Sequence, residues 1–176
     1  MEMHVYKSHR SASYSDYVSD GIKNNSGSAK LMKFGAGVEN SRISSPFPIP
    51  ENGLEVLWNH TLRFRGQSLN YIASTVHTNA NGSRAITVRD YKYYFAFSDP
   101  ELSTGDLNNK IFFLKRKTLA PSRVAGGITL VHETLDQVRS PRKSWIYVPG
   151  QRRVRRTPDL NHDTPDGATN SLRTID

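Results

Sequence analysis

The chain of 176 residues is long enough for one domain with a hydrophobic core and short for two. Hydrophobic residues make up 36% and charged residues 23%, which is typical of a folded protein with a polar surface. The absence of cysteine excludes a disulfide framework, a thiolate zinc site and a cysteine nucleophile. The net charge of +8 is local, because seven of the 24 Lys and Arg residues fall between Arg139 and Arg156. Nucleic acid and an anionic membrane surface are natural partners of such a region.

Residues 1–60 are predicted to form a helical and irregular N-terminal segment that packs on a sheet. A short helix is expected within residues 15–34, where glycines and an Asn-Asn pair argue against a long one. Residues 46–50 read Pro-Phe-Pro-Ile-Pro and predict a stiff extended segment, because proline fixes φ and lacks an N–H. A second short helix is predicted over residues 53–60, where apolar side chains recur at helical spacing.

Residues 61–156 change to a period of two, which predicts an antiparallel meander of about five or six strands. The predicted strands cover residues 67–78, 83–98, 110–119, 122–135, 143–148 and 151–156. Asn81-Gly82 predicts a hairpin turn, since both residues tolerate positive φ. Gly126-Gly127 predicts a bend or bulge in its strand. Residues 157–176 are predicted to be a loop-like tail of the same single domain.

Alternation along the strand predicted over residues 83–98 places a row of aromatic side chains on one face. The candidates for a hydrophobic cargo surface are Tyr91, Tyr93, Phe95, Phe97, Phe113 and Trp145. Aromatic rings supply large apolar area and tyrosine adds a polar group, which suits the lining of a cavity. An ordinary sheet core is the alternative, and alternation does not decide between the two.

A basic contact surface is the second candidate site. Its residues are Arg142, Lys143, Arg152, Arg153, Arg155 and Arg156. On a strand, Arg153 and Arg155 point to one side while Arg152, Val154 and Arg156 point to the other, as on a charged outer face or a protected edge. Contact with anionic headgroups or with an acidic protein is the alternative. No aromatic residues for base stacking interleave this stretch, so no nucleic-acid partner is expected.

Motifs for catalysis and for membrane insertion are missing from the sequence. It contains no nucleophile elbow and no phosphate-binding glycine loop after a strand. The histidines lack a spacing that would place metal ligands on one element. No apolar run reaches the length of a secretory signal core or the roughly 20 residues of a spanning helix. We therefore expect no enzyme activity, no metal and no cofactor.

Several short motifs occur in order along nearly the whole chain. They occupy residues 4–10, 46–50, 57–60, 63–66, 120–126, 133–137, 144–147, 150–156 and 172–176. Together, and above all through Trp-Asn-His at 58–60 and Gly-Gln-Arg-Arg-Val-Arg-Arg at 150–156, they resemble the bacterial domain-of-unknown-function 1329 family. Members of that family are much longer and begin with a secretory signal, so the chain resembles their middle third.

That family is similar to the LolA-like outer-membrane lipoprotein-sorting proteins, in which a curved antiparallel sheet cups helices over an apolar cavity. The resemblance implies a mainly β fold: the curved antiparallel sheet of a LolA-like half-barrel with a few short helices, incomplete in this chain. It also implies a location in the periplasm or outer membrane and non-catalytic binding of lipid, acylated or other hydrophobic cargo. The alternative is a structural or assembly component of an envelope or efflux complex, which uses the sheet to dock an envelope protein.

Overall fold

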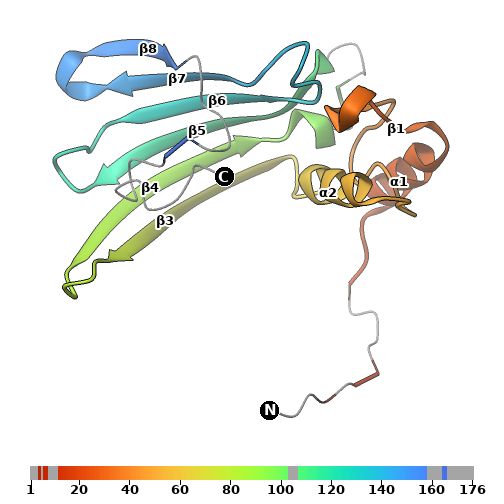
Figure 1. Cartoon of the computed structure of the whole chain (residues 1–176), viewed down its shortest axis with the longest axis horizontal. Coiled ribbons are helices and arrows are strands. Elements are labelled where there is room, and N and C mark those ends of the chain that lie inside the picture. The colour runs from red at the N-terminus through yellow and green to blue at the C-terminus, as the bar shows by residue number, and fades with distance from the viewer. Residues whose placement is uncertain (1–3, 5, 8–11, 103–106, 158–163, 166–176) are drawn as a thin grey trace.

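The computed structural model of the chain describes residues 4, 6–7, 12–102, 107–157 and 164–165. Its main element is an antiparallel sheet of six strands in chain order, with the helices at one end of the strands (Figure 1). The strands are β3 (Ser68–Thr78), β4 (Arg84–Tyr94), β5 (Lys110–Ala120), β6 (Ile128–Thr134), β7 (Lys143–Val148) and β8 (Arg153–Thr157). Within the described residues β3 and β8 are the edges, so the sheet is not closed into a barrel. The predicted mainly β, curved antiparallel meander with few helices is confirmed.

Two helices and a two-stranded sheet precede the meander. The helix expected within residues 15–34 is α1 (Asp16–Ser28), and the helix expected over residues 53–60 is α2 (Gly53–Leu62). The small sheet pairs β1 (Lys30–Leu31) with β2 (Val38–Glu39), around the 3-10 turn η1 (Lys33–Gly35). None of the described helices has the length and apolar character needed to cross a membrane.

Two predicted strands are too long. β4 ends at Tyr94, and the chain continues into the 3-10 turn η2 (Ala96–Ser98). β6 begins only at Ile128, because residues 121–127 form a turn in which Gly126 has a φ of 84°. The glycine pair therefore ends a turn and does not bulge a strand. The Asn-Gly hairpin is confirmed: the N–H of Gly82 donates to the carbonyl of Asn79 at 2.9 Å.

A buried asparagine fixes α1 to the rest of the fold. The side-chain amide of Asn25 donates to the carbonyls of Arg42 at 2.9 Å and Ser44 at 3.1 Å, and its oxygen accepts from the N–H of Arg42 at 3.0 Å. The N–H of Ile43 donates in turn to the carbonyl of Phe97 at 2.9 Å. The sequence favours a helix break near Asn24-Asn25, but Asn25 lies inside α1 because its amide satisfies backbone groups of another segment.

A second side chain joins α2 to the proline-rich segment. Asn59 accepts from the N–H of Phe47 at 2.8 Å and donates to the carbonyl of Phe47 at 2.6 Å. Trp58 donates its ring N–H to the carbonyl of Gly35 at 3.0 Å. Since prolines on both sides of Phe47 prevent regular pairing, the asparagine supplies the partners that a strand would otherwise provide.

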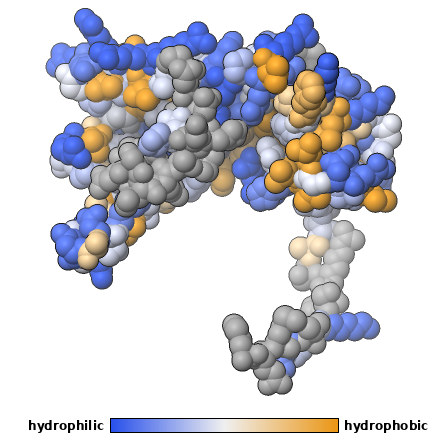
Figure 2. All heavy atoms as spheres, viewed as in Figure 1, coloured by the Kyte–Doolittle hydropathy of each residue, from blue (hydrophilic) through white to orange (hydrophobic). Residues whose placement is uncertain are grey.

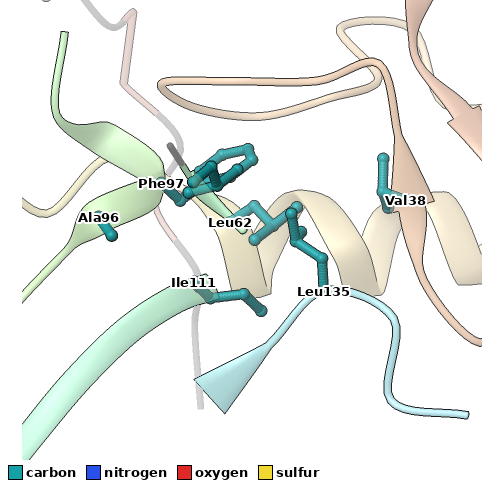
Figure 3. Close-up of a cluster of buried hydrophobic side chains, with 7 residues drawn as sticks. Val38, Leu62, Ala96, Phe97, Ile111 and Leu135 are labelled. Carbon is teal, nitrogen blue, oxygen red and sulfur yellow. The ribbon is translucent and has the colours of Figure 1, made fainter. Parts of the chain in front are cut away.

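The hydrophobic core lies at the helical end of the sheet. Its buried residues come from β2, α2, η2, the start of β5, and positions just before β5 and just after β6 (Figure 3). They are Val38, Leu62, Ala96, Phe97, Leu107, Ile111 and Leu135. On one face of the far half of the sheet, the described chain supplies no such layer: Ile72 is 66% exposed, Val76 53% and Ile86 53%. The helices thus pack against one end of the strands and do not cover the rest of the sheet.

The sheet has two faces that the pairing register defines. Tyr71 stands opposite Tyr91, and Tyr93 stands opposite Leu114, on what we call the tyrosine face. Phe113 stands opposite His132 on the other side, which we call the tryptophan face because Trp145 also lies there. Side chains alternate between these faces along each strand.

We expect Leu62→Ala to lower the free energy of unfolding by about 2–5 kcal/mol, because it opens a cavity in the core. Leu62 is 2% exposed, whereas Leu57 in the same helix is 63% exposed. Leu57→Ala is therefore the matched control, with an expected change within about 0.5 kcal/mol. Urea unfolding measures both; equal losses would show that the packing of α2 is not as described.

Candidate functional site

Aromatic rings form a continuous stack on the tyrosine face. The ring centroids of Tyr71 and Tyr91 lie 4.8 Å apart, with a 5° angle between the ring planes. Tyr93 stacks on Phe95 at 5.5 Å and meets Phe112 edge-on at 5.6 Å. Rings in such arrangements stabilise one another beyond their buried area. Burial and the neighbouring Tyr71 raise the pKa of Tyr93, so its phenol stays protonated at neutral pH.

An arginine closes the stack at the helical end. The guanidinium carbon of Arg65 lies 4.6 Å from the ring centroid of Phe95 and 5.9 Å from that of Phe112. Its Nε is buried without a hydrogen-bond partner. Burial, followed by the charge of Arg63, lowers the pKa of Arg65. The rings therefore hold this cation mainly through a cation–π contact.

A pocket continues from the stack toward the far end of the same face. Its volume is about 910 Å³. Residues of five strands, β4 to β8, line it together with Thr164 and Pro165; they include Thr87, Arg89, Arg116, Thr118, Thr129 and Ile146. Arg116 is the cross-strand neighbour of Tyr91, which makes the pocket and the ring stack contiguous. The wall combines apolar area with hydroxyl and guanidinium groups, as in sites that orient a mainly apolar ligand.

The six predicted cargo residues do not share one surface, so that prediction is wrong. Tyr91, Tyr93 and Phe95 contribute to the tyrosine face as expected. Phe97 is 1% exposed and belongs to the core, because the strand ends before it. The remaining two, Phe113 and Trp145, lie on the tryptophan face, and Phe112 takes the place on the tyrosine face.

The physical reason is that alternation relates side chains within one strand only. β4 ends at Tyr94 and β5 begins only at Lys110, and the register between the two strands places Leu114 opposite Tyr93. Tyr71 and Arg65 were also missed. For Tyr71 a signal existed, since the predicted hairpin at Asn81-Gly82 fixes the pairing of Tyr71 with Tyr91. No sequence signal places Arg65 over the rings.

The basic residues at the end of the meander lie on an edge strand. Arg153, Arg155 and Arg156 are exposed on β8, and hydrophilic residues follow this edge in Figure 2. The register places Arg153 and Arg155 on the tyrosine face and Arg156 on the tryptophan face, as predicted. Arg152 precedes the strand with a φ of 49°. Charged side chains protect such an edge from pairing with another chain.

Two members of the predicted basic surface lie elsewhere. Arg142 donates to the buried carboxylate of Glu133 at 2.6 Å, and its side chain is only 13% exposed. Its place on an exposed contact surface was wrong, because the sequence does not reveal that Glu133 faces it. Lys143 stands opposite His132 on the tryptophan face, which it shares with Arg156 but not with Arg153 and Arg155.

The tryptophan face carries a second cluster. His132 lies between Phe113 and Trp145, with ring centroids 4.6 Å and 4.8 Å away. Beyond Trp145, the face contains an apolar depression of about 500 Å³. It is lined by Ile128, Leu130, Trp145, Tyr147 and Val154. Within the described ranges, no group of three or more His, Asp or Glu residues could hold a metal ion.

The family model described as "Protein of unknown function (DUF1329)" matches residues 1–176. The chain belongs to the DUF1329 family. A similar protein is the uncharacterized protein PA3922 of Pseudomonas aeruginosa, which is 42% identical over 172 residues. The match covers 98% of this chain and 38% of that protein, so the chain spans well under half the length of this relative.

A crystal structure of a DUF1329 family protein from Desulfovibrio piger is also similar, with a TM-score of 0.44 and 14% identity. It covers 64% of this chain, which matches 44% of that one. Two of the DUF1329 motifs, at residues 46–50 and 57–60, contact each other through Asn59 and Phe47. They therefore serve the packing of α2 and do not lie on either face of the meander.

We expect Arg142→Ala to lower the free energy of unfolding by about 3–5 kcal/mol, because it removes the guanidinium that pairs with a buried carboxylate. Arg155→Ala on the exposed edge is the control, with an expected change within about 0.5 kcal/mol. Thermal or urea unfolding compares the two. A small effect at Arg142 would contradict the buried ion pair.

The pKa of His132 is lowered from its ordinary value of 6.5 by burial and by Lys110 and Lys143. Because the unfolded chain binds this proton more readily, the contribution of His132 to stability is present above pH 6.5 and is lost as the pH falls below it. We expect Lys143→Gln to raise the pKa of His132 and to weaken this pH dependence. Histidine NMR titration and urea unfolding at several pH values measure the two effects; an unchanged pKa would refute the coupling.

Proposed function

We propose that this DUF1329 chain belongs to a non-catalytic cell-envelope protein that binds lipid or acylated cargo on its tyrosine face. The observation that carries the proposal is the pocket of about 910 Å³ that continues from the ring stack on the same side of the sheet. Pockets for small ligands commonly measure about 300–1,000 Å³, are lined by apolar and aromatic side chains, and contain a few polar groups.

The chemistry of this face favours an elongated apolar ligand. Tyr71, which is 39% exposed, and Leu69, which is 40% exposed, leave apolar area open next to the stack. Covering such area contributes about 25 cal/mol per Å² before the entropic costs of binding are subtracted. The stacked rings are held by one another, so little side-chain entropy is lost when a chain packs on them.

Charge and fold similarity support the envelope setting. The exposed arginines of β8 give this edge an affinity for anionic lipid surfaces, at about 1 kcal/mol for each Arg near the surface. The resemblance of the DUF1329 family to LolA-like sorting proteins favours the periplasm or outer membrane. In this proposal the protein takes up its cargo beside a membrane and shields it from water.

A component of an envelope or efflux assembly is the second candidate. The observation that favours it is the pair of strand edges, β3 and β8, that no described strand covers. An edge strand offers unpaired backbone groups to another chain, so the sheet could be extended by an envelope protein. That function predicts no extractable ligand and no dependence on the rings of the tyrosine face.

The two candidates differ in their response to a pair of double variants. We expect Tyr71→Ala with Tyr93→Ala to weaken binding of a fluorescent fatty acid about tenfold or more, because two rings of the stack are removed. The control is Ile72→Ala with Tyr94→Ala, the next residue along each strand, which faces the other side.

Fluorescence titration gives the affinities, and native mass spectrometry with organic extraction identifies any lipid that copurifies. Equal losses in the two double variants would show that the tyrosine face is not the site. If the wild-type chain binds no fatty acid and carries no lipid, the result would favour the function as an assembly component.

A further inference from the structure

Three basic side chains converge on the tryptophan face near the helical end of the sheet. His132 of β6 stands directly opposite Lys143 of β7. Lys110 of β5 joins them because the register shifts between Lys110 and Phe112, so that Lys110 pairs with Thr134 on the side of His132. Regular alternation from Phe112 would have turned Lys110 to the tyrosine face. The bulge at Ile111 therefore builds the cluster.

These cations have no acidic partner among the described residues. No hydrogen bond or ion pair joins any of the three side chains to a carboxylate there, and all three are partly buried. Glu133, the acid next to His132 in sequence, faces the other side and pairs with Arg142. Lysine is rarely withdrawn from water without a counter-charge, so the cluster is electrostatically incomplete.

The charges act on one another and on a buried hydroxyl. Burial and then Lys143 lower the pKa of Lys110, while burial, Lys110 and Lys143 lower that of His132. Thr134, the cross-strand partner of Lys110, is fully buried, and its Oγ1 has no hydrogen-bond partner. The two ammonium groups and the imidazole thus disfavour one another's charged forms, and the hydroxyl next to Lys110 in the register is unsatisfied.

We propose that Lys110, His132 and Lys143 form a binding site for a phosphate-type oxyanion, either free phosphate or the phosphate of a lipid headgroup. Two ammonium groups and one imidazole supply charge-assisted donors, and an anion among them relieves their repulsion. The rings of Phe113 and Trp145 flank the imidazole and limit its access to solvent. The site lies on the opposite face from the ring stack, so it does not depend on the cargo proposal.

The first test follows His132 by NMR while inorganic phosphate is added at constant ionic strength. We expect the imidazole signals of His132 to shift in a saturable way and the His132 pKa to rise, because a bound anion favours the imidazolium. Lys110→Gln and Lys143→Gln should each weaken binding about tenfold. Lys92→Gln and Lys117→Gln, which remove exposed charges from the same face, should change it less than about twofold.

A second arm identifies the source of the anion. Vesicles of phosphatidylcholine containing one quarter phosphatidylglycerol are compared with vesicles of phosphatidylcholine alone, with the same variants. Binding that needs phosphatidylglycerol and Lys143 assigns the site to a lipid headgroup, whereas saturation by phosphate alone assigns it to the free anion. The proposal is overturned if neither phosphate nor the vesicles shift the imidazole signals of His132. It is also overturned if the control variants lose as much affinity as the Lys110 and Lys143 variants, with urea unfolding showing that all variants are folded.

Discussion

The structure depends on one constraint: a six-stranded sheet is packed against other elements at one end only. Leu62 of α2 and Phe97 of η2 meet the ends of β5 and β6 there, and that contact holds the helical segment on the sheet. A sheet must bury its apolar face against another layer to be stable. Beyond that end, no described α-helix packs on the meander, so apolar side chains such as those of Ile72 and Val76 stay exposed.

The two faces meet this constraint differently. On the tyrosine face, rings cover one another across β3, β4 and β5, and the surface continues into a large pocket. On the tryptophan face, Trp145 separates an apolar depression from a basic cluster around His132. A ligand with an apolar body suits the first face and an oxyanion suits the second. Both proposals follow from groups that the fold leaves incompletely covered.

The elements of the fold follow from the sequence to a large extent. The Asn-Gly turn, the period of two and the basic edge strand are local features, and the structure places all three as predicted. The start of β6 and the end of β4 were misplaced because the strand pattern continues into residues that the fold places in turns, up to Gly126 and in η2. The contact of Asn59 with Phe47 explains why two family motifs occur together, which no single-chain pattern could show.

The candidate sites were less predictable, since they depend on contacts between strands. The register between β4 and β5 fixes which face Phe113 takes, and a one-residue bulge brings Lys110 to the face of His132. Neither the register between β4 and β5 nor the bulge in β5 can be predicted from composition or alternation. The pairing of Arg142 with Glu133 is likewise a long-range event that turns a surface cation into a buried one.

Native-state hydrogen exchange, resolved for single amides, tests the central claim that packing is confined to one end of the sheet. The account predicts that amides near Phe97, Ile111 and Leu135 exchange only through global unfolding, because these side chains form the core. Amides of β3 and β4 next to the hairpin should exchange about a hundredfold faster or more, through local opening. Uniform protection from the helical end to the hairpin would contradict the account, since it would require a second packed layer over the far half of the sheet.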